Sequence, residues 1–307
     1  MKRICSKPIL VFTALWMLTG VLAIVGLLEF PRTSLRQADP DLSHSNGYPR
    51  FSKLRSDFAI PVLMYHRVSP LTDDERQSPL VSDLTVSPAD FESQMKYLKD
   101  QGFTFLLASQ VEDAVKTGKS LPEKSIAITL DDGYHDNFEY ARPILKKYGI
   151  CATIFVVTSV VGDAKHMSWP EIREMHRNPM GYGSHTVTHP DLTRLALDDL
   201  DYELRESKRV LESHLLERIS AVAYPSGQYN NLVAARTQAA GYQAGWKKGG
   251  GPVTPNADRY LLPRVRVHGR TTEADFNRKV WSGQYVVRGY DAVKIARKTG
   301  YPLYAKT

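Results

Sequence analysis

The stretch Ser125-Ile126-Ala127-Ile128-Thr129-Leu130-Asp131-Asp132-Gly133-Tyr134 joins an apolar run to two adjacent carboxylates and a glycine. A short apolar run that ends in turn residues is typical of a buried strand, so we expect a strand over 125–130. Two carboxylates directly after a buried strand are costly unless a metal ion or a proton compensates them. Because side chains alternate along extended backbone, Asp131 and Asp132 are expected to point in different directions and to serve different tasks. Asp-Asp-Gly is also ordinary turn chemistry, so the motif alone does not decide between a turn and a functional site.

Similar apolar runs alternate with amphipathic segments from residue 60 onward. Strands are expected over 60–65, 125–130, 152–157, 181–184, 219–224, 242–246 and 265–268, and helices over 88–101, 137–148, 169–177, 197–215 and 232–240. Strands interleaved with helices predict βα units and a parallel sheet, closed or nearly closed into a barrel. The expected fold class is therefore α/β, and the functional groups of such barrels lie at the carboxyl ends of the strands.

A second motif follows the expected strand 181–184 and reads Ser184-His185-Thr186-Val187-Thr188-His189-Pro190. Two histidines four residues apart meet on one face where the backbone is helical or tightly turned, which suits a shared metal ion. One carboxylate and two histidines, with open positions for water and substrate, make a hydrolytic zinc site. A single histidine is usually structural, so the prediction depends on this pair occurring together with Asp131 and Asp132.

The N-terminus predicts export. Lys2, Arg3 and Lys7 precede an uncharged run over 8–28. About 20 helical residues at ~1.5 Å each span a hydrocarbon core of ~30 Å, and the positive charges retain their end in the cytoplasm. A cleaved signal peptide is the alternative, but its apolar region is normally about 7–15 residues long and ends at small residues. We therefore expect an uncleaved transmembrane anchor over 1–30, with the catalytic part on the extracytoplasmic side of the cell membrane.

Composition divides the rest of the chain and limits its partners. A polar linker is expected over 31–57, one domain over 58–280 and a C-terminal tail over 281–307. The net charge of +7 favours anionic partners. Zinc-finger spacing, RNA-binding aromatic motifs and long basic blocks are not found in the sequence, so nucleic acid is not an expected partner. Cys5 and Cys151 are too few for a disulfide framework or a thiolate zinc site.

The two motifs together resemble the polysaccharide deacetylase family, carbohydrate esterase family 4, with its NodB homology domain. Thr129–Gly133 and, about fifty residues later, Ser184–Pro190 carry the resemblance. Further matching segments are Pro61–Val68, Ala152–Val156, Ala223–Gly227 and Leu262–Val265. The similarity covers about 60–272 and implies a distorted (β/α) barrel of about seven strands.

The resemblance implies roles for individual residues. Asp132, His185 and His189 would bind a divalent metal, zinc first and cobalt or nickel as alternatives that fit the same ligands. Asp131 would be the general base that takes a proton from the attacking water. The metal and a backbone N–H after Pro225 would stabilise the oxyanion.

Several positions depart from the usual family pattern. Ala223 stands where an arginine is common, and Gly245-Trp246-Lys247 is at best a remnant of a later Asp-Trp motif. With the early Tyr65–Val68, these changes are similar to the branch that deacetylates poly-β-1,6-N-acetylglucosamine in biofilms, where the motif order is permuted. That branch places the catalytic acid at His66, whereas ordinary members place it at a position equivalent to His268. Arg264 is a candidate to replace the missing arginine beside Asp131.

The implied function is metal-dependent removal of N-acetyl groups from an extracytoplasmic N-acetylhexosamine polysaccharide, with poly-β-1,6-N-acetylglucosamine as the first candidate. Peptidoglycan, chitin-like oligomers and xylan remain alternatives, as does a non-catalytic carbohydrate-binding protein. The implied partners are the polysaccharide and the membrane, and association with a polysaccharide synthesis or export complex is left open. Aromatic side chains that could stack on sugar rings, or pack in the core, are Tyr134, Trp169, Tyr224 and Trp246.

Overall fold

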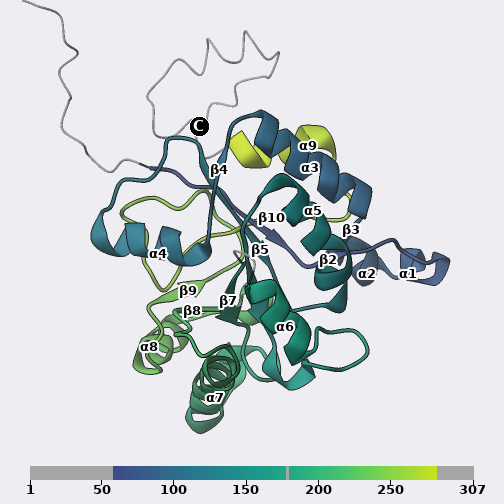
Figure 1. Cartoon of the computed structure of the whole chain (residues 1–307). Helices are drawn as coiled ribbons and strands as arrows, with labels where there is room; N and C mark the ends of the chain where they lie inside the picture. The colour runs from purple at the N-terminus through teal and green to yellow at the C-terminus, as the bar shows by residue number, and fades with distance from the viewer. Residues whose placement is uncertain (1–57, 178–179, 282–307) are drawn as a thin grey trace, which may run out of the picture. The chain divides into compact units, whose positions relative to one another are not determined.

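The computed structural model describes residues 58–177 and 180–281, coloured in Figure 1. The predicted anchor over 1–30, the linker over 31–57 and the tail beyond residue 281 lie outside these residues, so their predictions stand as they are. Among the helices of the two described ranges, none has the length and hydropathy needed to cross a bilayer.

One parallel sheet of eight strands forms the centre of the molecule. Its strands are β1 (Val62–Tyr65), β4 (Thr104–Leu106), β5 (Ser125–Leu130), β6 (Ala152–Val156), β7 (Met180–Ser184), β8 (Ala221–Ala223), β9 (Ala244–Trp246) and β10 (Val265–Arg266). They run in the order β10-β1-β5-β6-β7-β8-β9, and β4 pairs with the first half of β5. The seven predicted strands are all present in this sheet, and β4 is its one member that the sequence did not predict.

The two ends of the curled sheet approach each other through the segment before β10. Leu262 forms a bridge with Trp246 of β9, and the Leu262 N–H donates to the Gly245 carbonyl at 2.9 Å. Three residues later, Val265 pairs with Leu63 of β1. Backbone pairing thus leads from β9 back toward β1, consistent with the expected distorted (β/α) barrel.

Helices surround the sheet and cover its outer face. They are α1 (Asp73–Gln77), α2 (Pro79–Leu84), α3 (Pro88–Asp100), α4 (Ala108–Thr117), α5 (Arg142–Tyr148), α6 (Trp169–His176), α7 (Leu197–Leu215), α8 (Asn231–Ala239) and α9 (Glu273–Trp281). The helix predicted over 137–148 begins with a π-helical turn, Asn137–Ala141, and continues as α5. A separate two-stranded sheet, β2 (Arg67–Val68) with β3 (Thr85–Val86), flanks α1 and α2 in the chain.

Alternation along the strands produces two apolar clusters. Val62, Ala127 and Phe155 belong to the inner cluster, whereas Leu63 and Ile128, one position on, pack in the outer cluster with the helices. This is the period-two pattern of strands buried on both faces. The same alternation carries through β5 to Asp131, which follows the inner residues Ala127 and Thr129 and so lies at the mouth of the barrel interior.

Candidate metal centre and active site

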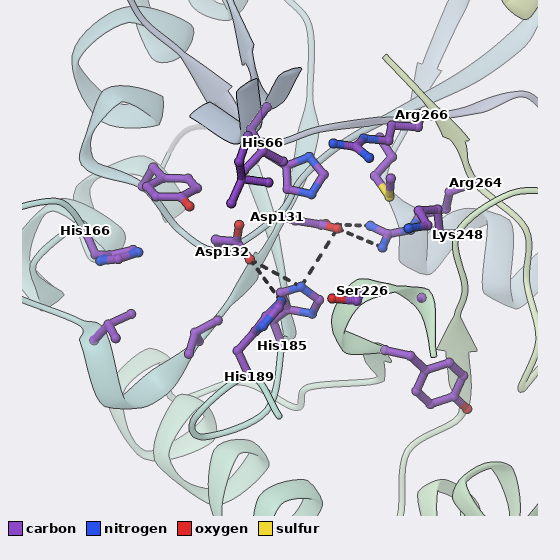
Figure 2. A pocket seen from close by; sticks show the side chains of 18 of the residues that line it. His66, Asp131, Asp132, His166, His185, His189, Ser226, Lys248, Arg264 and Arg266 are labelled. Atoms are coloured by element: carbon purple, nitrogen blue, oxygen red, sulfur yellow. Dashed lines mark hydrogen bonds and ion pairs between the residues drawn. The ribbon is translucent and has the colours of Figure 1, made fainter. Parts of the chain in front are cut away.

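A cavity of about 470 Å³ opens at the carboxyl ends of the strands. Its wall includes all the residues predicted for catalysis and metal binding except His268: His66, Asp131, Asp132, His185 and His189. Figure 2 shows these side chains pointing toward one another from different strand ends. The structure therefore gathers residues that are as much as 123 positions apart in the chain, from His66 to His189.

Asp132, His185 and His189 converge on one point. The Asp132 Oδ1 atom lies 3.4 Å from His185 Nε2 and 3.6 Å from His189 Nε2. The ligand atoms of the three residues all lie within 4.8 Å of one another. Asp132 Oδ1 is buried and makes no hydrogen bond with the described residues. An orphaned carboxylate oxygen between two imidazole nitrogens is the donor set that a divalent cation such as Zn²⁺ requires, so these residues fit a metal ion.

Hydrogen bonds orient the first histidine for this task. His185 Nδ1 lies 2.7 Å from the Ala223 carbonyl oxygen at the end of β8, and a carbonyl only accepts, so Nδ1 carries the proton. The lone pair of Nε2 then faces Asp132, which is how metal-binding histidines are usually held. Burial lowers the pKa of His185, which favours the neutral, ligating form.

The loop that carries the histidines is held by a residue that the sequence did not identify. Glu203 of α7 is buried, and its Oε2 accepts from the backbone N–H groups of Val187 at 2.7 Å and Thr188 at 2.9 Å. The Thr188 hydroxyl donates to Glu203 Oε1 at 2.6 Å. Three hydrogen bonds accepted by this one carboxylate thus fix the turn between His185 and His189. A glutamate in the middle of an amphipathic helix gives no sequence signal of this role.

Asp131 is held by a buried arginine. Arg264 Nη1 and Nη2 donate to Asp131 Oδ1 and Oδ2 at 2.5 and 2.8 Å, and both residues are nearly inaccessible to solvent. Burial alone would raise the pKa of Asp131, but the charges of Arg264, His185 and His66 outweigh it and lower the pKa to about 2. Asp131 is therefore a carboxylate at neutral pH. Arg264 occupies the place suggested for it from the sequence (Figure 2).

Asp131 and Asp132 have different partners, as expected, yet both line the same cavity. The expectation of opposite directions assumed extended backbone, whereas Asp132 has a φ of 73°, in the left-handed region. This left-handed turn places the Asp132 carboxylate at the mouth of the barrel, where Asp131 also lies. The two still have different partners, an arginine for Asp131 and two histidines for Asp132.

The two candidate acids occupy different surroundings. His66 lines the cavity, and its buried Nδ1 atom makes no hydrogen bond with the described residues. Burial lowers the pKa of His66 to about 4, although the charge of Asp131 acts to raise it. His268 is absent from the cavity wall, and its Nδ1 lies 3.0 Å from Asp83 Oδ1. Geometry therefore favours His66 as the residue that can reach a substrate.

The aromatic side chains divide into two groups. Tyr134 and Tyr224 line the cavity, and the Tyr134 ring stacks on His166 with centroids 4.9 Å apart. Trp246 is fully buried and donates through Nε1 to Glu112 at 2.8 Å, and Trp169 stacks on His214 away from the cavity wall. Of the two roles considered for these tryptophans, sugar stacking and core packing, the structure supports core packing.

A strand-rich barrel whose strand ends present an Asp-His-His cluster beside an arginine-held carboxylate is the architecture of a hydrolase of the esterase and deacetylase type. The chain belongs to the polysaccharide deacetylase family, whose profile matches residues 118–245. It is 32% identical over 208 residues to YxkH of Bacillus subtilis (strain 168), described as a polysaccharide deacetylase, with 68% of this chain and 71% of that protein covered.

Two further relatives carry more specific names. The poly-beta-1,6-N-acetyl-D-glucosamine N-deacetylase of Staphylococcus aureus (strain MSSA476) is 30% identical over 241 residues, which cover 71% of this chain and 82% of that protein. Among solved structures, the Streptococcus pyogenes deacetylase PplD in complex with acetate superposes with a TM-score of 0.69 at 30% identity, covering 73% of this chain and 99% of that one. The family resemblance seen in the sequence is thus confirmed.

Proposed function

We propose that this protein is a metal-dependent N-deacetylase of an N-acetylhexosamine polysaccharide, with poly-β-1,6-N-acetylglucosamine as its substrate. One observation carries the proposal: Asp132, His185 and His189 converge beside Asp131, a carboxylate that Arg264 keeps ionised. Hydrolysis of an acetamide needs an activated water, a base and a stabilised oxyanion. A cation held by Asp132, His185 and His189 would activate the water and stabilise the oxyanion, and Asp131 would be the base.

Asp132, His185 and His189 would hold the cation, and zinc suits one carboxylate and two imidazoles. When bound, such a cation lowers the pKa of a coordinated water and polarises a carbonyl oxygen. Cobalt and nickel also suit these ligands, so the metal identity is part of the proposal.

Asp131 accepts a proton from the attacking water, because its carboxylate is ionised at neutral pH and lies 4.0 Å from the Nε2 atom of the ligand His185. We assign the oxyanion contact to the backbone N–H of Ser226, which lines the cavity directly after Pro225. The next N–H along the chain, that of Gly227, donates instead to the Tyr224 carbonyl at 2.8 Å.

His66 is assigned as the group that protonates the leaving amine. With a pKa of about 4 it is neutral at pH 7, so it must take up a proton from solvent before it can donate one to the amine. The negative charge of Asp131 favours that uptake, since it raises the pKa of His66 against the effect of burial.

The choice of polymer rests on similarity to the S. aureus enzyme and on the early His66 motif. Peptidoglycan and chitin-like oligomers would present the same acetamide on another polymer, and acetylated xylan would present an acetate ester to the same groups. A non-catalytic carbohydrate-binding protein is disfavoured because none of the four residues Asp131, Asp132, His185 and His189 is lost.

The location outside the membrane is also proposed from the sequence. Lys2, Arg3 and Lys7 followed by the uncharged run 8–28 support a single-pass anchor with the catalytic domain on the extracytoplasmic side. There the enzyme would meet its polymer during or after export.

The test is acetate release from β-1,6-linked N-acetylglucosamine oligomers compared with peptidoglycan fragments, with and without chelator. We expect release from the β-1,6-linked oligomers that chelator abolishes and added zinc restores. Asp131→Asn should lower kcat by about 10²–10⁴-fold, as for loss of a general base, while bound metal stays unchanged. Full activity of this variant, or activity that survives complete removal of metal, would refute the assignment.

A further inference from the structure

Two arginines of the β10 segment, Arg264 and Arg266, line the cavity, and only Arg264 is paired with Asp131. Arg264 is occupied by Asp131, as described above. Arg266 lies two positions further along the strand, pairs with Met64 of β1 in register and lines the cavity. In Figure 2 its guanidinium lies beside the His66 ring.

A single carboxylate from α2 holds Arg266 in this place. Arg266 Nη2 donates to Asp83 Oδ2 at 2.7 Å, and His268 Nδ1 lies 3.0 Å from Asp83 Oδ1. The backbone N–H of Gly269 also donates to the Asp83 carbonyl at 3.0 Å. Three contacts thus hold α2 against the last residue of β10 and the segment that follows it.

The approach at this fastening is so close that it requires a glycine. A Cβ atom on Gly269 would lie 2.1 Å from the Ser82 carbonyl oxygen and 2.3 Å from that of Thr85. Leu80 and Leu84, on either side of Asp83 in α2, contribute to the cavity wall. The close contact between Gly269 and α2 therefore fixes the position of both the apolar cavity wall and Arg266.

Arg266 keeps hydrogen-bonding capacity that its partners in the described residues do not use. Its Nε atom is buried without a hydrogen-bond partner, and so is Nδ1 of His66 on the same cavity wall. The side chain is about one-fifth exposed, so the guanidinium reaches the cavity while Asp83 fixes its orientation. Buried polar atoms without partners are rare in native proteins and call for an explanation, such as a bound polar group.

We propose that Arg266 is a substrate-binding residue that donates to a hydroxyl or acetamide oxygen of the sugar, and that Asp83 is its positioning residue. This inference rests on the proposed function, since it names a contact of the same site. Arg266 contributes to binding of the sugar, whereas Asp131 and the proposed metal ligands take part in the chemical step. The Asp83 contacts thus tie α2, between β2 and β3, to the end of β10 and the residues after it.

The experiment measures KM and kcat for acetate release from a β-1,6-linked N-acetylglucosamine tetrasaccharide by the zinc-loaded full-length protein. Arg266→Gln should raise KM about tenfold, the loss expected for one hydrogen bond from a charged donor, and change kcat less than threefold. Asp83→Asn should raise KM by a similar or smaller factor. In the double variant Asp83→Asn/Arg266→Gln, the Asp83 change should add less than twofold, because it acts through Arg266.

Matched controls separate this role from a general loss of structure. Arg270→Gln removes an exposed arginine of the same connection, and Asp73→Asn removes an exposed carboxylate of the neighbouring helix α1; both should keep KM within twofold. Arg266→Lys retains charge and should recover part of the lost affinity. Metal content and unfolding midpoint are measured for every variant.

The outcomes are distinguishable. If the unchanged protein releases no acetate from any oligomer, the proposed function and this inference both fall. If it turns over normally and KM is unchanged in Arg266→Gln, only the role of Arg266 is overturned. Independent, multiplicative effects of the two changes would instead overturn the positioning role of Asp83.

Discussion

The Asp131–Arg264 pair offers a quantitative test of how the site is held. Replacing Arg264 by Met keeps most of the side-chain volume but leaves the Asp131 carboxylate buried without its cation. Removing one partner of a buried ion pair typically costs about 3–5 kcal/mol. The pKa of Asp131 gives a lower figure: a fall from 3.8 to about 2 corresponds to about 2 kcal/mol of stabilisation in total. We therefore expect Arg264→Met to lose about 2–5 kcal/mol of unfolding free energy at pH 7.

The sign of the pH dependence follows from the same shift. In the unchanged protein the pKa of Asp131 is lowered, so its ionised form stabilises the fold fully above pH 3.8, and this contribution is lost as pH falls through about 2. Without Arg264, burial would raise the pKa of Asp131. Protonation then relieves the buried charge, so the stability difference between variant and unchanged protein should narrow as pH falls from 7 toward 4.

Urea unfolding of metal-free protein in chelator, at pH 7 and pH 4.5, measures both effects. Arg236→Met is the matched control, because Arg236 makes a two-pronged pair with Asp201 that is partly exposed, and such pairs contribute about 0–1 kcal/mol. Adding Asp131→Asn to Arg264→Met should recover stability, since it removes the unpaired charge. An Arg264→Met protein within 1 kcal/mol of the unchanged one, or no recovery in the double variant, would refute the reasoning.

Two further predictions concern the metal loop and the acid. Glu203→Ala should weaken zinc binding about 10–100-fold in a chelator competition, as loss of a group that orients metal ligands does. Glu206→Ala, which removes a partly exposed carboxylate of α7 that pairs with Arg209, should not. Equal affinities of the two variants would contradict the role given to Glu203. His66→Gln should lower kcat about 10²–10⁴-fold with metal content unchanged, and His268→Gln less than threefold; the reverse order in steady-state rates would move the acid to His268.

The convergence of the candidate ligands could be predicted because residue type and strand order point to the same place. Asp132, His185 and His189 are groups that bind metals, and they follow apolar strands, so a parallel sheet brings them to one edge. Arg264 needed the family pattern as well, because an isolated arginine gives no indication of its partner 133 positions away. The strands themselves were predictable because buried parallel strands form continuous apolar runs.

What the sequence missed depends on contacts between distant segments. Strand β4 is three residues long, too short for periodicity to show, and it is defined by its pairing with β5. The sequence pattern of Trp246 fits either a sugar platform or a core residue, and its bond to Glu112, 134 positions away, decides for the core. Asp83 and Glu203 are ordinary helical acids until the fold gives them partners.

Backbone conformation explains why the metal site cannot be derived from the His-x-x-x-His spacing alone. Five non-glycine residues in the described ranges have positive φ, and three lie in the turns that carry the candidate metal ligands: Asp132 at 73°, Thr186 at 69° and His189 at 62°. Each such residue costs roughly 1–2 kcal/mol, so the turns form only because other contacts offset the strain.

Those contacts are local and specific. The Thr186 N–H donates to Ser184 Oγ and the His189 N–H donates to Thr186 Oγ1, both at 3.0 Å, while Glu203 accepts the N–H groups between them. On a regular helix the two rings would lie one above the other along one face. Here their planes cross at 77° with centroids 4.8 Å apart, and both Nε2 atoms face Asp132 Oδ1. The hydroxyls and the glutamate therefore hold strained backbone in the geometry that places both Nε2 atoms near one carboxylate oxygen. The fold thus preorganises the candidate site, so that a cation bound there would gain these ligands without reordering of the loop.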